Sequence, residues 1–224
     1  MNFDQIKKAS AYVWSFGKNQ MGELGIGHYK NAMMAERVRG LPPKVKVTNI
    51  SSGGNHTGVV TDDGKLWICG SNIHDKLGLE GITTGSKKTF KPVELMSAHR
   101  VIQVACGDYH TLCLTDLGKI YVWGGSLHKK RGDKSEDRKG QPNYQPSLIR
   151  SLESKFIIRI ECGDFHSLAL EDNGSVYSWG TSQQGECGHG VFKDVEIPTR
   201  IKYLDGKNII TIVAGNHHTL ALTS

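Results

Sequence analysis

The residues of this chain that could do chemistry are four histidines that recur at nearly even intervals. They are His56, His110, His166 and His218, and they lie 54, 56 and 52 residues apart. Four imidazoles gathered around one point could bind a metal ion such as zinc, which takes nitrogen ligands at about 2 Å. Copies of a repeated unit lie side by side, however, so equivalent side chains are spread along the array. We therefore expect structural histidines that hydrogen-bond backbone groups, and no metal site.

Other catalytic signatures are weak or absent from the sequence. Cys106 precedes His110 by four positions, and Cys162 precedes His166 by four, but there is no Cys-x-x-Cys pair. There is no Gly-x-Ser-x-Gly nucleophile motif. The run 17–22 has the glycine spacing of a phosphate loop but lacks the Lys-Ser/Thr that follows one. The sequence therefore predicts a protein that is not an enzyme and that needs no cofactor.

The histidines belong to a longer repeated sequence. The segment 106–114, Cys-Gly-Asp-Tyr-His-Thr-Leu-Cys-Leu, recurs as 162–170, Cys-Gly-Asp-Phe-His-Ser-Leu-Ala-Leu, with weaker copies at 53–57 and 215–220. A period near fifty residues indicates one supersecondary unit that is copied several times and buries its surface against its neighbours. We interpret the recurring residues as structural, namely the four histidines together with Gly53, Gly107, Gly163, Gly215, Gly70, Gly124 and Gly180.

Each unit has the pattern of four short β-strands. A first apolar run, such as 101–105, is followed by the histidine run, an Asp-x-Gly turn and a third run that ends in glycine. Aspartate and glycine at these turns favour tight hairpins. A fourth run contains proline, which cannot donate to a ladder and belongs on an outer edge. This is the strand pattern of a β-propeller blade, so we predict an all-β propeller. Residues 28–40 are the best candidate for a helix.

The units predict a single domain, 1–224, that is organised as successive blades. The units are 11–41, 45–96, 101–150, 156–204 and 208–224. The first opens with a third-type strand at 11–17, and the last holds first- and second-type strands. The two ends could therefore share one blade, which would remove exposed sheet edges.

The chain resembles a known repeat family. The elements Gly-x-x-His-[Ser/Thr]-x-x-Leu, Asp-x-Gly, x-x-[Trp/Phe/Cys]-Gly and Gly-x-Leu-Gly, the last intact at 22–25, are similar over 11–224 to regulator of chromosome condensation repeats. The resemblance implies a propeller, usually of seven blades. The founding member is an exchange factor for the small GTPase Ran and docks on nucleosomes. Many relatives are protein-interaction modules attached to ubiquitin ligases, kinases or cytoskeletal assemblies, so the resemblance implies the fold more strongly than the function.

The four blades' worth of sequence here leave three interpretations open. The chain could close with four blades, form an open arc that another subunit completes, or be part of a longer propeller. We expect an incomplete or partner-completed ring, because blades shaped for a wide ring would need a larger tilt to close with four.

Composition limits the partners and the cellular location that we expect for the protein. The formal net charge is +6, which favours acidic partners. Five cysteines without a pairing pattern indicate free thiols in a reducing compartment. No apolar run is long enough to span a bilayer. We therefore expect an intracellular, cytoplasmic protein, with cytoskeletal, ciliary or nuclear locations left open.

The polar insertion at 128–140 is the strongest candidate binding loop. It holds six Lys/Arg and three Asp/Glu, and loops on rigid scaffolds often carry recognition; a solvated loop without a partner is the alternative. The candidate binding residues are Lys129, Lys130, Arg131, Lys134, Arg138 and Lys139, with Lys87 and Lys88 in a second loop. We predict a non-enzymatic interaction or scaffold module that binds an acidic protein surface. Exchange activity on a small GTPase and chromatin docking are the alternatives. Nucleic-acid binding is disfavoured because no aromatic residues interleave with the lysines.

Overall fold

A computed structural model describes residues 12–81, 85–125, 132 and 144–224. In these residues the chain forms short antiparallel strands in five sheets, with no α-helix. The all-β prediction is confirmed. No helix in this part of the chain is long and apolar enough to cross a bilayer.

Three of the sheets are complete four-stranded blades. The first blade contains β3 (Val47–Ser52), β4 (His56–Thr61), β5 (Leu66–Ser71) and β6 (Ser86–Pro92). The second contains β7 (Val101–Cys106), β8 (His110–Thr115), β9 (Ile120–Gly124) and β10 (Ser147–Leu148). The third contains β11 (Ile157–Cys162), β12 (His166–Glu171), β13 (Val176–Gly180) and β14 (Val195–Arg200). Short 3-10 turns follow the outer strands at Glu94–Met96, Arg150–Leu152 and Lys202–Leu204, and another follows β5 at Ile73–Asp75.

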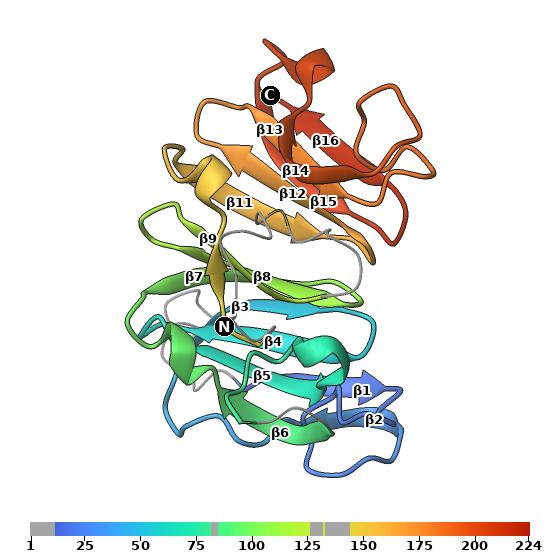
Figure 1. Cartoon of the computed structure of the whole chain (residues 1–224). Helices are drawn as coiled ribbons and strands as arrows, with labels where there is room; N and C mark the ends of the chain where they lie inside the picture. Colours follow the sequence, from blue (N-terminus) through green and yellow to red (C-terminus); the bar gives the residue numbers. More distant parts are fainter. Residues whose placement is uncertain (1–11, 82–84, 126–131, 133–143) are drawn as a thin grey trace.

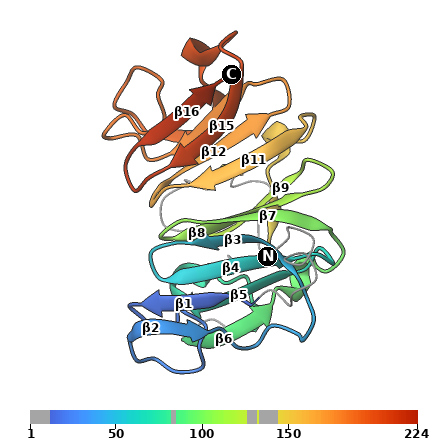
Figure 2. The ribbon, with the colours of Figure 1, turned by 180° about the vertical axis from the view of Figure 1, so that it is seen from behind.

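The two remaining sheets are half-blades at opposite ends of the stack. The N-terminal half-blade consists of β1 (Trp14–Gly17) and β2 (Ala32–Arg37), and the C-terminal half-blade of β15 (Ile209–Ala214) and β16 (Thr219–Thr223). Figures 1 and 2 show the sheets stacked in chain order, with β1–β2 at one end and β15–β16 at the other. The two halves do not share a blade within one chain, because they lie at opposite ends of the arc.

The hairpin turns and the proline-containing edge strands lie where the sequence predicts them. Gly64, Gly118 and Gly174 close the predicted hairpins with φ of 81°, 69° and 82°, a region that glycine adopts without a steric cost. The proline-containing strands β6 and β14 lie at the edges of their sheets, as their missing N–H groups require. These two predictions are confirmed.

The expected helix over 28–40 is wrong. This segment contains β2, whose Met33 and Met34 side chains are 99% and 81% exposed. The segment instead has the place of the fourth strand of a blade. Trp14 of β1 pairs with Arg37 of β2, and Gly17 pairs with Ala32. Pairing with the neighbouring strand overrides a weak local preference for helix.

The core lies between consecutive blades. One cluster joins Val60 and Ile68 of the first blade to Val104 and Trp123 of the second. Similar clusters join the second blade to the third, and the third blade to β15. Every residue of β8 and β12 is buried, because each of these central strands has a sheet on both faces. The blade-to-blade contacts therefore fix where the loops between strands are held.

Candidate partner-binding surface

The repeated histidines connect one blade to the next. His56 Nε2 lies 2.9 Å from Thr111 Oγ1, and His110 Nε2 lies 2.7 Å from Ser167 Oγ. His166 Nε2 makes the same contact with Thr219 Oγ1, at 3.0 Å. The prediction that these histidines bond backbone groups is wrong in this detail, because the acceptor is a hydroxyl of the neighbouring blade.

The hydroxyl groups in turn fix the protonation of the histidines. Thr111 Oγ1 donates its hydrogen to Lys76 O at 2.7 Å, and Thr219 Oγ1 donates to Glu186 O at 2.8 Å. A hydroxyl has one hydrogen, so it must accept from the imidazole, whose Nε2 is then protonated. Burial lowers the pKa of His56 well below its usual value and lowers the pKa of His166 to about 4. These imidazoles are neutral structural groups at neutral pH.

The fourth histidine lies in a different environment. His218 belongs to the C-terminal half-blade and is exposed. No cluster of three or more metal-ligating side chains occurs among the residues that the structure describes. His56, His110 and His166 form inter-blade hydrogen bonds.

The repeated glycines provide space for these contacts. The carbonyl oxygen of Gly163 lies 2.8 Å from where a Cβ on Gly107 would be, and the ring of His110 is equally close. Gly163 is confined in the same way by Gly215 and His166. A second group, Gly70, Gly124 and Gly180, ends the third strands with φ of 103°, 82° and 110°. Gly53 and Gly215 occupy the equivalent loop positions of the first blade and the C-terminal half-blade.

All five cysteines are free thiols. Burial raises the pKa of Cys106 to about 12 and that of Cys187 to about 11. Thiols with such pKa values are poor nucleophiles at neutral pH, because little thiolate is present. These two cysteines are therefore packing residues.

Aromatic rings form a continuous stack across the loops that precede the histidine strands. Tyr109 and Phe165 stack with ring centroids 5.0 Å apart, and Phe165 and His217 stack at 6.0 Å. The ring of His74 extends the series at 4.9 Å from Tyr109. We call these four rings and the adjacent carboxylates of Asp108 and Asp164 the rim ladder.

The rim ladder is held by backbone hydrogen bonds between blades. Asp108 N donates to Asp164 O, and Asp164 N donates to Asn216 O, each at 3.2 Å. The buried Lys76 donates from Nζ to Asp108 O at 2.8 Å. Burial raises the pKa of Asp164, and the nearby Asp108 adds to this effect. The arrangement presents partly exposed rings and carboxyl groups on a fixed backbone, a suitable contact for cationic or aromatic side chains.

The rim ladder was not predicted from the sequence. Its signal was the aromatic or histidine residue that precedes three of the four repeated histidines, at Tyr109, Phe165 and His217. We interpreted that motif as purely structural. Only the blade spacing shows that these side chains contact one another.

The residues predicted to bind a partner lie partly outside the described residues. Those of the 128–140 insertion, Lys129, Lys130, Arg131, Lys134, Arg138 and Lys139, fall in the ranges 126–131 and 133–143. Lys87 and Lys88 were expected in a loop but lie in the edge strand β6. The Lys88 ammonium lies 5.7 Å from the centroid of the Tyr29 ring. The structure therefore does not bring Lys87 and Lys88 into the rim ladder.

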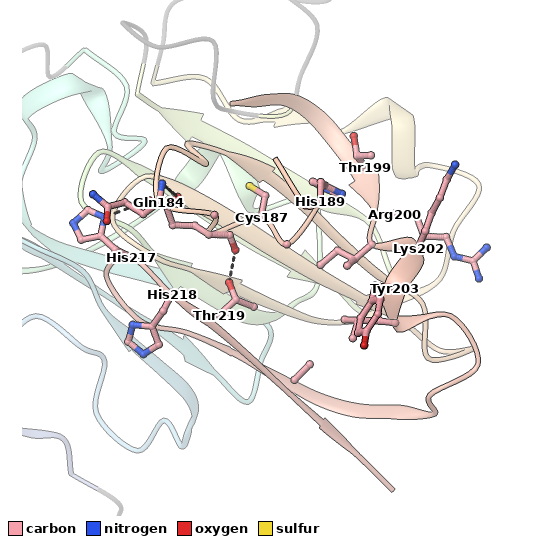
Figure 3. Close-up of a pocket in the computed structure, with 17 residues that line it drawn as sticks. Gln184, Cys187, His189, Thr199, Arg200, Lys202, Tyr203, His217, His218 and Thr219 are labelled. Atoms are coloured by element: carbon pink, nitrogen blue, oxygen red, sulfur yellow. Dashed lines mark hydrogen bonds and ion pairs between the residues drawn. The ribbon is translucent and has the colours of Figure 1, made fainter. Parts of the chain in front are cut away.

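A large cavity lies at the C-terminal end of the arc. It has a volume of about 1050 Å³ and is lined by the loop 184–190, the segment 199–204 and strand β16. Figure 3 shows Cys187, Tyr203, His218 and Thr219 around it. The cavity lies against the half-blade, where a complete blade would have two further strands.

Comparison with known proteins places the fold in a family. The model of the regulator of chromosome condensation (RCC1) repeat matches residues 11–60, 63–114, 118–170 and 173–222. The E3 ubiquitin-protein ligase HERC2 of Mus musculus is 34% identical over 219 residues, which cover 94% of this chain and 4% of that protein. The ultraviolet-B receptor UVR8 of Arabidopsis thaliana is 29% identical over 212 residues, covering 94% of this chain and 46% of that protein.

Solved structures show the same fold. Human WBSCR16 superposes with a TM-score of 0.84 at 22% identity, over 96% of this chain and 54% of that one. Prp20p from Saccharomyces cerevisiae gives a TM-score of 0.79 at 24% identity, over 94% of this chain and 51% of that one. The chain thus spans about half the length of these propellers, and a far smaller share of HERC2. On the evidence of its four matched repeats and its blades, the chain belongs to the RCC1 repeat family.

Proposed function

We propose that this protein is a non-catalytic protein-binding module that recognises its partner through the rim ladder. The observation that carries the proposal is the stack of Tyr109, Phe165 and His217 beside the carboxyl groups of Asp108 and Asp164. Aromatic side chains of this kind dominate the energy of protein interfaces. The loops that carry Tyr109, Phe165 and His217 belong to three successive sheets, so no single blade forms this surface alone.

Rigidity supports this function. The ladder loops are tied to one another through Asp108, Asp164 and Asn216, so little ordering is needed when a partner binds. The partner chemistry that fits is a basic or aromatic side chain, because carboxylates attract cations and ring faces attract guanidinium and ammonium groups.

The basic insertion adds a second contact of opposite charge. Its six Lys/Arg residues favour an acidic region of the same partner. A scaffold role within a larger assembly and an intracellular location remain part of this proposal. HERC2 is described as an E3 ubiquitin-protein ligase, and the matched residues cover 4% of it, so a relative of this module occurs within a much longer protein.

Guanine-nucleotide exchange and chromatin docking remain alternatives. Prp20p is described by its binding properties to Gsp1p and histones, and its 24% identity to this chain shows the fold alone. No side-chain feature of the described residues favours exchange over simple binding, so we rank it second.

The test is quantitative co-purification followed by direct binding. Tagged wild-type protein and the variants Phe165→Ala and Asp164→Asn are expressed in the native cell, and bound proteins are identified by mass spectrometry. Phe192→Ala is the matched control, because Phe192 is 79% exposed and lines neither the ladder nor the cavity. The main partner is then purified and titrated calorimetrically.

We expect Phe165→Ala to weaken that titration about tenfold or more, as loss of an aromatic hot spot does. Phe192→Ala should bind as tightly as the wild type. Equal affinity of the wild type and both ladder variants would overturn the assignment of the ladder.

A further inference from the structure

The outer edge of the first blade lies where the positive charge of the chain is concentrated. The segments 26–46 and 86–91 together hold eight Lys/Arg and one Asp/Glu, a net charge of +7. The whole chain has a net charge of +6, so all other residues together carry −1. The two segments are far apart in the sequence, but Figures 1 and 2 show β2 beside β6. The fold therefore gathers the charge on one side of the arc.

Backbone hydrogen bonds hold the two segments together. Gly27 N donates to Lys88 O at 2.7 Å, and Phe90 N donates to Arg39 O at 2.9 Å. These bonds lie on the side of β6 that faces away from β5, where Ile26 and Thr89 form an antiparallel bridge. The outer edge of β6 is thus already paired, so a peptide from a partner cannot add to it as a further strand.

Five cationic side chains at this edge form what we call the outer basic surface. Four of them are exposed and one, Lys87, is half-buried. In the part of the chain that the structure describes, none of the five forms an ion pair with a carboxylate. The one carboxylate of these segments, Glu36, lies 3.2 Å from His28 instead. The five residues are Lys30, Arg39, Lys87, Lys88 and Lys91. Their charges are therefore available to an anionic partner.

An apolar side chain protrudes beside these cations. Met33 of β2 is 99% exposed, and it follows the residue that pairs with the last glycine of β1. Lys88 and Glu196 hold the same place in the outer strands of the first and third blades, and both are exposed. This position therefore faces solvent in complete blades too, so the exposure of Met33 comes from its place on an outer strand.

Tyr29 links the apolar and the basic parts of this edge. Its ring is 46% exposed, and its hydroxyl donates to Ser86 O at 3.2 Å. The ammonium group of Lys88 lies 5.7 Å from the centroid of the ring. A tyrosine with an apolar ring and an anchored hydroxyl is typical of side chains at a boundary between water and an apolar phase.

This combination fits an anionic lipid surface better than a nucleic acid. Lysines attract acidic headgroups without a fixed geometry, and an exposed apolar side chain gains by entering the boundary with the acyl chains. A phosphate backbone would give Met33 no apolar environment. Single-stranded nucleic acids stack on free aromatic faces, whereas the Tyr29 ring already lies near the Lys88 ammonium.

We propose that the outer basic surface, with Met33 and Tyr29, docks peripherally on membranes that carry anionic headgroups. The five cations bind the headgroups, and Met33 enters the interface between headgroups and acyl chains. Each signal alone gives weak binding, and the two together give stable attachment. The rim ladder lies in the loops before the second strands, whereas this surface lies on fourth strands. The inference therefore does not rest on the proposed function.

Vesicle sedimentation tests the proposal directly. The purified protein is mixed with vesicles of equal parts phosphatidylcholine and phosphatidylserine, or with vesicles of phosphatidylcholine alone. We expect the wild type to sediment with the acidic vesicles and to stay in solution with the neutral ones. Added salt should weaken the binding, because exposed charges are screened. Failure to sediment with the acidic vesicles at low salt would overturn the proposal.

A matched pair of charge variants locates the contact. Lys88→Gln combined with Lys91→Gln should weaken binding to the acidic vesicles about tenfold or more. Lys202→Gln combined with Lys207→Gln removes the same charge from exposed positions at the other end of the arc. Lys207 also lies near a tyrosine ring, 4.9 Å from the centroid of Tyr203. Equal effects of the two double variants would overturn the assignment to this surface.

A second comparison distinguishes a membrane from a nucleic acid. Met33→Ser should weaken vesicle binding about fivefold, whereas Val191→Ser, at a 56% exposed position in the loop before β14, should have no effect. Binding of Met33→Ser equal to that of the wild type would overturn the apolar part of the contact. Binding to duplex DNA through Lys88 and Lys91 without binding to the vesicles would identify a nucleic-acid surface instead. Far-ultraviolet circular dichroism verifies that each variant is folded.

Discussion

The side chain of Gln103 forms two hydrogen bonds with the backbone of Ile160 in the next blade. Gln103 Nε2 donates to Ile160 O at 2.8 Å, and Ile160 N donates to Gln103 Oε1 at 3.0 Å. The Gln103 amide thus hydrogen-bonds the edge of β11 that faces away from β12, as a neighbouring strand would. This contact joins the second and third blades, as the His110–Ser167 hydrogen bond also does.

Replacement of Gln103 by leucine should destabilise the protein. The variant leaves both Ile160 groups without their partner in a partly buried interface, and each unsatisfied group costs about 1–3 kcal/mol. Urea titration should show a lower midpoint with an unchanged slope. Gln183→Leu serves as the control, because Gln183 is exposed. Equal midpoints for the two variants would contradict a structural role for the Gln103 pairing.

Gly163→Val should also destabilise the fold, for a steric reason. The carbonyl of Gly215 and the ring of His166 occupy the space that a side chain would need. Forced repacking of such a contact costs about 1–3 kcal/mol. The free energy of unfolding measured by urea titration reports this change, and a loss below about 0.5 kcal/mol would show that the loops can separate freely.

Stability should fall as the pH drops from about 6.5 to about 4. The folded pKa of His166 is lowered to about 4 by burial, and that of His56 is lowered as well. Between those pH values the unfolded chain binds more protons than the folded chain, so protonation favours unfolding. Each such histidine contributes a slope of up to about 1.4 kcal/mol per pH unit.

The histidine contribution can be separated from that of the carboxylates. The variant His166→Gln removes the titrating group but retains an N–H donor for Thr219. Urea titrations at pH 4.5 and 7.5 should show a smaller stability difference for the variant than for the wild type. An identical difference would mean that His166 does not titrate as its burial requires.

Charge reversal in the basic insertion should abolish capture of the acidic partner region. The triple variant Lys129→Glu, Lys130→Glu, Arg131→Glu replaces three positive charges by three negative ones, which repel an acidic surface. The far-ultraviolet circular dichroism spectrum should stay unchanged. Surface plasmon resonance with the purified partner gives the comparison, and unaltered affinity would remove the insertion from the binding site.

We expect no acceleration of nucleotide release from small GTPases. The purified protein is mixed with a panel of GTPases that carry a labelled guanine nucleotide, and the fluorescence decay is compared with buffer alone. A rate increase on any member would favour the exchange alternative over the binding module.

Local sequence patterns determined the strands and their order. The alternation of apolar runs, Asp-x-Gly turns such as 62–64 and edge prolines such as Pro92 specifies four-stranded units, because turn and ladder chemistry act over a few residues. The repetition of His56, His110 and His166 at a period near fifty residues indicated a structural role for these side chains. The same local reasoning failed for 28–40, where strand pairing prevails over a weak pattern.

Only the tertiary structure decided how the units meet. The acceptors of His56 and His110 are hydroxyls more than fifty residues away, and no local pattern identifies them. The stacking of Tyr109 on Phe165 likewise depends on the spacing of two blades. The sequence showed that the two ends of the chain are complementary halves, but the curvature of the arc keeps them apart. Strands and turns form through residues that are close in the sequence, so local patterns predict them. Contacts between blades join residues about fifty positions apart, and their geometry depends on how the sheets are spaced in the folded chain.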